Sequence, residues 1–279
     1  MRKLAHKLTR NFALTSGVIL TAALVIVALA APLLAPFDPA AQETSRRLEH
    51  PSREHPLGLD DLGRDVLSRV VWGARVSLRV GFSVVLLASL IGVTLGALAG
   101  YFGGAIDTII MRLTDILLAF PGILLAIALV AVLGPSLNNV IIALATIGWV
   151  GYARLVRGQV LKIREMEYVT AAKALGARSW RVIVRHVLPN VINPVIVMAT
   201  LGLAGAILSE AALSFLGLGV QPPTPSWGAM LTSGRQYLGR ANHLAVFSGA
   251  AIMLAVMGLN FLGDGLIDAL DPRYRQLIK

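Results

Sequence analysis

The sequence predicts an all-α, polytopic membrane protein with six transmembrane helices, and three observations lead to this fold class. Of the 279 residues, 56% are hydrophobic and only 14% are charged, whereas ordinary soluble domains carry about a quarter charged residues. Mean hydropathy is +0.73. The apolar residues also gather into runs of roughly 20, the length that crosses about 30 Å of hydrocarbon at 1.5 Å per residue.

Six such runs follow one another along the chain, at 13–35, 80–101, 115–134, 137–156, 191–215 and 244–266. The first follows a basic stretch, MRKLAHKLTR, and could be taken for a signal peptide. Its apolar run is 23 residues long, which exceeds the about 7–15 residues of a signal-peptide core. We therefore expect a retained span. Pro121 and Pro194 interrupt the third and fifth runs and are expected to kink those helices.

Lysine and arginine residues set the expected orientation, because basic loops stay on the cytoplasmic side. With the N-terminus inside, the inner segments hold 16 of these residues and the outer segments eight, with Arg79 at a boundary. Both termini are therefore expected in the cytoplasm. The net charge of +10 comes from basic residues that lie between the apolar runs. It does not indicate a nucleic-acid partner, because a nucleic-acid-binding protein would carry its basic residues on the surface of a soluble module.

The order of spans and loops gives the expected domain organisation. It comprises a cytoplasmic N-terminal segment (1–12), the first span (13–35), an extracytoplasmic segment (36–78), a five-helix core (79–268) that includes a cytoplasmic loop (157–189), and a cytoplasmic tail (269–279). The stretch HPLGLDDLGRDVLSRVVWGARVSL predicts a helix on the outer membrane surface before the second span, with Asp60 or Asp61 as N-cap. The later outer loop, GVQPPTPSWGAM, is expected to be stiff, with Trp227 as an interfacial anchor.

Small and charged residues within the spans predict particular contacts. Gly92, Gly96 and Gly100 recur every four residues, a spacing that lets a second helix approach closely. Glu210 lies inside the fifth run, where an ionised carboxylate costs about 2.5–3.5 kcal/mol to insert, so it should face protein or water. Two interpretations of Glu210 remain open: a residue of a translocation route or moving helix contact, and a hydrogen-bonded strut near the outer surface. Arg112 is within helical reach of acids on either side and is expected to pair locally.

The most unusual segment is YVTAAKALGARSWRVIVRHVLPN, residues 168–190, a polar insertion between two apolar runs. Its first part is rich in alanine, which favours a helix that a partner can approach closely. Gly176 then permits a left-handed turn or a helix C-cap. In the second part, apolar side chains (Trp180, Ile183, Val184, Val187) and basic ones (Arg178, Arg181, Arg185) fall on opposite faces. This part is expected to lie along the inner lipid surface and to end at Pro189, where the fifth span starts.

The segment resembles the EAA loop of ABC importer permease subunits. Ala171, Ala172, Gly176, Leu188 and Pro189 stand in register with that pattern, whereas Thr170 replaces its glutamate and His186 its isoleucine. The loss of the glutamate puts a charged contact at position 170 in doubt. Four further stretches, HPLGLDDLGRDVLSRVVWGARVSL, MRLTDILLAFPGILLAI, SEAALSFLGLGVQPPTPSWGAML and NFLGDGLIDALDPR, are similar to the C-type permease of dipeptide and oligopeptide importers, so the resemblance covers nearly all of 12–275.

The resemblance implies the type I permease fold of ABC importers in a bacterial or archaeal cytoplasmic membrane. It implies four partners besides membrane lipids: a homologous second permease, two cytoplasmic ABC ATPases and an extracytoplasmic solute-binding protein. The coupling residues toward the ATPase would be Tyr168, Thr170, Ala171, Ala172, Leu175, Gly176, Leu188 and Pro189. The basic helix with Arg178, Trp180, Arg181 and Arg185 would act as a lever on the membrane. The implied cargo is peptide, with nickel chelates, glutathione or another small solute as alternatives.

The chain itself is expected to carry out no chemistry. It contains neither the Gly-x-x-x-x-Gly-Lys-Ser/Thr phosphate loop nor a His-Glu-x-x-His metal motif, so ATP and Mg²⁺ would be used by the partner ATPases and this chain would bind no cofactor or metal. A self-sufficient channel or secondary transporter would favour ionisable residues at the bilayer centre, and an intramembrane enzyme would require convergent polar groups at depth. Both alternatives are less favoured.

Overall fold

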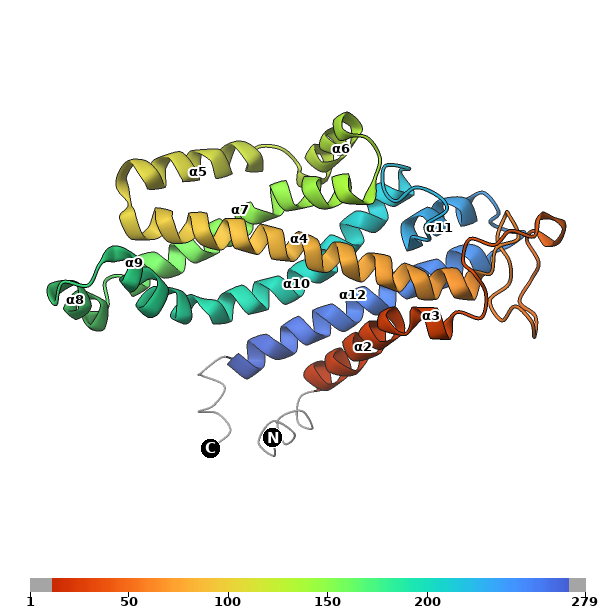
Figure 1. The fold of residues 1–279 in the computed structure, drawn as a ribbon, viewed down its shortest axis with the longest axis horizontal. Helices are drawn as coiled ribbons and strands as arrows, with labels where there is room; N and C mark the ends of the chain where they lie inside the picture. The colour runs from red at the N-terminus through yellow and green to blue at the C-terminus, as the bar shows by residue number, and fades with distance from the viewer. Residues whose placement is uncertain (1–11, 271–279) are drawn as a thin grey trace.

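The computed structural model describes residues 12–270, and in this part of the chain every long element is an α-helix. The long helices are α2 (Phe12–Leu29), α4 (Val66–Phe102), α7 (Leu137–Ile163), α10 (Leu188–Phe215) and α12 (His243–Leu270). They run roughly along one axis as an elongated bundle (Figure 1). The shorter helices are α3 (Ala31–Leu34), α5 (Gly104–Leu118), α6 (Gly122–Leu133), α8 (Glu167–Ala174), α9 (Ser179–Val182) and α11 (Trp227–Arg235).

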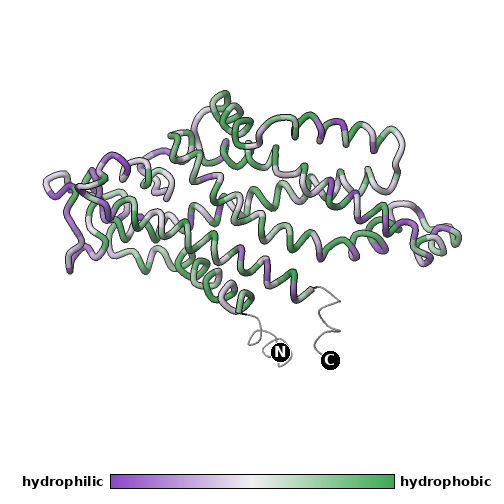
Figure 2. The backbone as a smooth tube through the Cα atoms, turned by 180° about the vertical axis from the view of Figure 1, so that it is seen from behind, coloured by the Kyte–Doolittle hydropathy of each residue, from purple (hydrophilic) through white to green (hydrophobic). Residues whose placement is uncertain are grey.

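Polarity is distributed as a membrane protein requires. Figure 2 shows hydrophobic residues along the long helices and hydrophilic residues gathered at the two ends of the bundle. Five helices are long and apolar enough to cross a bilayer, and a sixth span is present if a bent pair counts as one. The six-span, all-α prediction is therefore confirmed. The segments 1–11 and 271–279, which hold most of the predicted cytoplasmic N-terminus and tail, lie outside the described residues.

The third span is broken, where the sequence predicted only a kink. α5 and α6 meet at 88°, and Pro121 stands at the N-cap of α6. Proline has no backbone N–H and disfavours helical backbone in the residue before it, so the helix cannot continue through this position. α5 also begins eleven residues before the expected span start at 115. Its N-cap is Gly103 and its first residue is Gly104, with φ angles of 67° and 56°.

The second span is longer than predicted. α4 is one continuous helix of 37 residues, so the separate interfacial helix expected before it does not exist. Its N-cap is Asp65, whose carboxylate accepts a 2.7 Å hydrogen bond from the Ser68 backbone N–H, and not Asp60 or Asp61. The helical periodicity was real, but it belongs to the first turns of a span that projects beyond the expected boundary at residue 80.

Glycines bring α4 and α7 into close contact, as the sequence predicted. A Cβ atom at Gly92 would lie 2.5 Å from the Trp149 carbonyl oxygen, and one at Gly96 would lie 2.4 Å from that of Ala153. At Gly100 the nearest atom would be Val160 Cβ, at 2.8 Å. The two backbones therefore touch over more than two helical turns, which is how helices associate where lipid provides no hydrophobic drive.

A second glycine contact, between α2 and α12, was not predicted. A Cβ at Gly17 would lie 2.3 Å from the Leu262 backbone nitrogen, and one at Gly265 would lie 2.5 Å from Leu14 Cα. Gly258 likewise faces Leu20, at 2.7 Å from its Cβ. The two helices are adjacent in Figure 1. Because glycines on both helices contribute, neither helix alone shows a regular small-residue stripe in the sequence.

Candidate functional site

The segment singled out in the sequence forms a small projecting unit at one end of the bundle. α8 and α9 lie together at the left end of Figure 1, at the opposite end from residues 35–65. α8 spans Glu167–Ala174, against the predicted 168–175, and Val169 is its one fully buried residue. The exposed side chains include Tyr168, Thr170, Ala171 and Leu175, and Leu175 is 89% exposed. Leu175 is thus an apolar side chain at the projecting end of the unit that no part of the described chain covers.

Gly176 ends α8 in the geometry that the sequence predicted. Its φ is +81°, the left-handed region that glycine adopts without steric cost. The Gly176 N–H donates to the Lys173 carbonyl at 3.0 Å, and the Ala177 N–H donates to the Ala172 carbonyl at 3.1 Å. These two bonds form the Schellman motif of helix C-termini. They fix the angle at which the chain leaves α8.

Two side-chain contacts tie α8 to the long helices, and sequence reasoning missed both. The Lys173 ammonium lies 5.1 Å from the centre of the Tyr101 ring, near the end of α4. The Asn190 amide donates a 3.2 Å hydrogen bond to the Tyr168 hydroxyl, and Asn190 is in the first turn of α10. In both pairs the two residues are separated by more than 20 positions, so no local pattern in the sequence predicts the contact. A displacement of α8 would act directly on α4 and α10 through these contacts.

Thr170 stands where the EAA pattern has glutamate, and its side chain is exposed. Its hydroxyl makes a 3.4 Å contact with the Met166 carbonyl of its own helix. The two acidic residues before Thr170 do not replace that glutamate. Glu167 is the first residue of α8, and Glu165, ahead of the helix, pairs with Arg164 at 2.9 Å. The exposed face of α8 is therefore uncharged at position 170.

The basic helix differs from the prediction in two ways. It does not stop at Pro189, because α9, a π-helical turn (Ile183–Val187) and α10 form one continuous helix of 37 residues. Pro189 therefore lies inside this continuous helix, directly after the π turn, where the Leu188 N–H donates to the Ile183 carbonyl five residues earlier. A proline inside a helix removes one backbone hydrogen bond, and the irregular turn stands just before that position. The π turn widens the helix just before the proline, so the register changes.

The expected apolar face is also divided. Ile183 and Val187 are buried, together with Val182, whereas Trp180 is 71% exposed and Val184 is 41% exposed. The buried residues pack with α7 residues and Val169 in one core cluster. Arg178, Arg181 and Arg185 are exposed. The helix thus rests on protein through one face, and only the other is free to meet lipid or a partner.

Two ion pairs attach α5 to α7. Arg157 donates two hydrogen bonds to Asp107, of which the Nη2–Oδ2 bond is 2.6 Å, and Arg154 pairs with Asp115. The predicted local pairing of Arg112 with these acids is wrong, because the acids face α7. Thr114 is the one fully buried residue of α5, and Leu117 packs partly buried on the core cluster. The two ion pairs add direct side-chain links between α5 and α7.

We expect the Asp107–Arg157 pair to be exchangeable. Asp107→Arg should lower accumulation in the membrane, because it places two cations together, whereas the double variant Asp107→Arg/Arg157→Asp should restore it. Asp107→Asn should cost about 1 kcal/mol, since the pair is partly exposed. Thermal unfolding of the purified protein in detergent measures these effects. Equal loss in the single and double variants would contradict the pairing.

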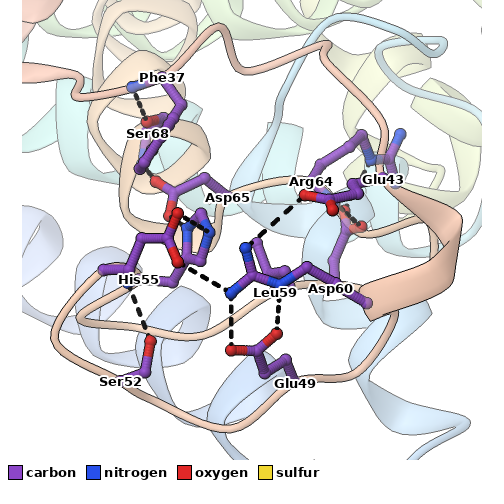
Figure 3. Close-up of polar contacts among 12 residues, drawn as sticks. Phe37, Glu43, Glu49, Ser52, His55, Leu59, Asp60, Arg64, Asp65 and Ser68 are labelled. Atoms are coloured by element: carbon purple, nitrogen blue, oxygen red, sulfur yellow. Dashed lines mark hydrogen bonds and ion pairs between the residues drawn. The ribbon is translucent and has the colours of Figure 1, made fainter.

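Residues 35–65 form a compact polar unit at the other end of the bundle (Figure 3). The His55 Nδ1 atom lies 2.9 Å from Asp65, and the Arg64 Nε atom lies 2.7 Å from Asp60. Arg69 approaches the same Asp60 carboxylate at 3.4 Å. All five side chains are buried. Removing Asp60 would take the shared carboxylate from two buried guanidinium groups, and breaking a buried pair in this way costs about 3–5 kcal/mol.

The outer side of this unit carries an exposed charge cluster. Arg46 donates to Glu49 at 2.7 and 2.9 Å and to Glu54 at 3.1 Å. The hydrogen bonds from Arg46 hold the pKa of the Glu49 carboxyl below its usual value. Behind the unit, Trp227 is 2% exposed and donates from Nε1 to the Val70 carbonyl at 2.9 Å. Trp227 is therefore a core residue, and the prediction of an interfacial anchor is wrong.

Comparison with known proteins identifies the architecture. Residues 92–276, more than half of the chain, match the family described as "Binding-protein-dependent transport system inner membrane component". The chain belongs to this family. It is an ABC importer permease subunit with several membrane-spanning helices, and permeases of this family are not enzymes. The match begins within α4 and leaves α2 and residues 35–65 outside it.

Curated relatives extend the match over almost the whole chain. The dipeptide transport system permease protein DppC of Alkalihalophilus pseudofirmus is 49% identical and covers 98% of this chain and 90% of its own. The di/tripeptide permease DppC of Pseudomonas aeruginosa is 44% identical, with 99% and 93% covered. The glutathione permease GsiD of Pectobacterium atrosepticum is 46% identical, with 90% and 84% covered.

A solved structure shows the same fold. A chain from the inward-facing MetNI methionine ABC transporter superposes with a TM-score of 0.55 at 20% identity, covering 72% of this chain and 96% of that chain. The permease fold is thus confirmed independently of close sequence similarity. Among the described residues, no group of three or more His, Asp or Glu side chains could hold a metal ion.

Within this permease, Glu210 joins two elements. Its side chain is fully buried, and its Oε1 atom accepts hydrogen bonds from Ser214 at 2.6 Å and Ser226 at 2.9 Å. Ser214 lies on α10 with Glu210, whereas Ser226 is the N-cap of α11. The carboxylate therefore fastens the start of α11 to the end of α10. The other carboxyl oxygen, Oε2, is buried without a hydrogen-bond partner among the described residues. The bonds through Oε1 agree with the strut, and a part in the translocation route stays a prediction.

We expect Glu210→Ala to destabilise the protein and Glu210→Gln to be tolerated. The alanine variant leaves two buried hydroxyls without an acceptor, at about 1–3 kcal/mol each, whereas glutamine keeps a carbonyl oxygen for both. Thermal unfolding and membrane accumulation measure the difference. If Glu210→Gln accumulates normally but loses transport, the carboxylate acts on the translocation route and the strut interpretation fails.

Proposed function

We propose that this chain forms, with a homologous second permease, the path by which dipeptides and oligopeptides enter the cell. Two ABC ATPases would drive transport with ATP and Mg²⁺, and an extracytoplasmic solute-binding protein would deliver the peptide. This chain would bind no cofactor itself. The proposal of a peptide cargo rests on the relatives of 49% and 44% identity, both named for peptide transport.

The geometry of α8 carries the coupling part of the proposal. α8 projects from the bundle, exposes Leu175 almost completely and contacts both α4 and α10. A helix placed in this way can receive a movement of an ATPase and pass it to two spans. ATP binding and hydrolysis would then shift the permease pair between inward-open and outward-open states through differential contacts.

The proposed orientation places α8 in the cytoplasm and residues 35–65 outside, in the bacterial or archaeal cytoplasmic membrane. The excess of basic residues on the α8 side supports it. Because the chain contains no cysteine, single-cysteine variants can report it directly. In intact cells, Arg53→Cys should react with an impermeant thiol reagent and Leu175→Cys should not, and the reverse result would overturn the orientation.

Uptake tests the proposed cargo. In a strain lacking this gene, the restored gene should recover uptake of labelled alanyl-alanine, and unlabelled dipeptides should compete better than glutathione. Glutathione is the second candidate, because one relative of 46% identity is named for its transport. Recovery of glutathione uptake without alanyl-alanine uptake would favour that alternative, and recovery of neither would reject both.

A further inference from the structure

A groove among four helices is the strongest unassigned feature of the described residues. Its volume is about 500 Å³, within the range of small-molecule sites. It is lined by residues of α4, α6, α7 and α10, and we call it the α7–α10 groove. Its wall includes four glycines, Gly122, Gly148, Gly202 and Gly205, and its hydroxyl groups come from Tyr152 and Ser209. No charged side chain lines it.

The groove lies halfway along the spans. Val84 and Ala88 are near the middle of α4, Tyr152 is near the middle of α7, and Gly202 is near the middle of α10. A solute that crosses the membrane must pass this depth. A polar solute there has lost most of its water, so hydroxyl groups on the wall become valuable to it.

Tyr152 provides an independent sign of a ligand. The residue is 4% exposed, and its buried hydroxyl has no hydrogen-bond partner among the described residues. Buried hydroxyls are normally paired, because leaving one unpaired is costly. The hydroxyl lies against Gly202, another residue of the groove wall: a Cβ atom built at Gly202 would be 2.8 Å from it. A small movement of α10 away from α7 would uncover the hydroxyl to the groove.

A second groove shows the contrast. The α10–α12 groove has a volume of about 590 Å³ and is lined by α10, α11 and α12, including Gly249, Ile252 and Met253. Its lining side chains are all apolar. Such a surface suits a lipid chain, which requires no hydrogen bond. Size therefore does not separate the two grooves, but the presence of hydroxyls does.

We propose that the α7–α10 groove is this subunit's part of the peptide path, and that Tyr152 and Ser209 donate hydrogen bonds to the carbonyl groups of the passing peptide. The proposal rests on the proposed import of peptides. The peptide group is common to all dipeptides, so two hydroxyls on an apolar, glycine-rich wall can serve many side chains. Selection among peptides is then left to other parts of the system.

Blocking the groove is the first test. No atom lies within 4 Å of a Cβ built at Gly205, so Gly205→Leu should fold normally and fill the groove. We expect alanyl-alanine uptake to fall by an order of magnitude or more, because the path is obstructed. Gly249→Leu is the matched control: its nearest atom would be 3.9 Å away, and it fills the other groove. Normal uptake by Gly205→Leu would overturn the proposal.

Chemical labelling tests whether peptide occupies the α7–α10 groove, even if a bulky variant fails to accumulate. The chain has no cysteine, and thiols react with thiosulfonates as thiolates, which form in water and not in hydrocarbon. In membranes holding the assembled transporter, Ser209→Cys should be labelled and alanyl-alanine should slow the labelling, whereas Gly249→Cys should stay unlabelled. An unreactive Ser209→Cys, or labelling that peptide does not slow, would contradict a peptide path here.

Tyr152→Phe separates function from structure. Because the hydroxyl has no protein partner, its removal should leave the unfolding temperature unchanged or higher, while alanyl-alanine uptake falls several-fold. Unchanged uptake would remove Tyr152 from the path. Wild-type uptake is the reference. If the wild type fails to import alanyl-alanine, the proposed cargo is wrong. If the wild type imports it and the groove variants import it equally well, the cargo stands and the groove assignment alone is wrong.

Discussion

Gly176→Val should abolish most uptake while the protein still accumulates in the membrane. The φ of +81° at Gly176 is strained for any L-residue, and a β-branched one costs about 1–3 kcal/mol there. The strain would be relieved by a change in the backbone angle at which the chain leaves α8, at the expense of the two hydrogen bonds that Gly176 and Ala177 donate there. The added side chain itself would clash with nothing, because no atom lies within 4 Å of a Cβ built at Gly176. Uptake in cells and peptide-stimulated ATP hydrolysis by the purified complex measure the uncoupling.

Gly176→Asn is the matched control for this prediction. Asparagine adopts left-handed backbone more readily than other non-glycine residues, so it should retain much more uptake than valine at the same position. The pair therefore separates backbone conformation from side-chain size, which is unconstrained here. Normal uptake by Gly176→Val would show that the geometry of this turn has no part in coupling.

Gly96→Leu should prevent the permease from accumulating as a folded protein. The added Cβ would lie 2.4 Å from the Ala153 carbonyl oxygen, which is backbone and cannot rotate away. Separating α4 from α7 would open the largest helix contact of the bundle and expose the cluster around Ala153 and Val156. Overpacking a core typically lowers the free energy of unfolding by about 1–3 kcal/mol. At Gly96 we expect a loss at the upper end of this range or above it, because the neighbouring atom belongs to the backbone.

The control for Gly96→Leu is Gly158→Leu, on the facing helix. Gly158 is also helical, but nothing lies within 4 Å of its Cβ position. Quantitative detection of each variant in membranes, followed by size-exclusion chromatography in detergent, should show loss of the first and retention of the second. Equal accumulation of the two variants would mean that α4 and α7 are not held by this contact.

Much of the fold followed from hydropathy, because each span must satisfy its own backbone in lipid and so appears as a continuous apolar run. The run at 137–156 starts with α7, which ends seven residues later, and the run at 191–215 ends with α10, which starts three residues earlier. Boundaries were less predictable where a helix leaves the bilayer. α4 continues outward as an amphipathic helix, and the basic helix continues into α10, since packing against protein replaced the expected contact with lipid.

The candidate coupling segment was predictable in form but not in attachment. Its helix, its glycine turn and its basic face are local properties, and α8 and Gly176 match them. The pairs Lys173–Tyr101 and Tyr168–Asn190 are not local. The roles of these residues in transport remain predictions, which the Gly176 variants address.

The sequence by itself determined the membrane-spanning class, the close approach at Gly92, Gly96 and Gly100, and the left-handed turn at Gly176, because each depends on residues near one another in the chain. Only the tertiary structure decided which polar groups meet. Trp227 is buried against Val70, Glu210 binds Ser226, and Asp107 faces Arg157. Each partner is chosen by how the helices pack, since a polar group in an apolar bundle must find its hydrogen bond wherever packing brings one within reach.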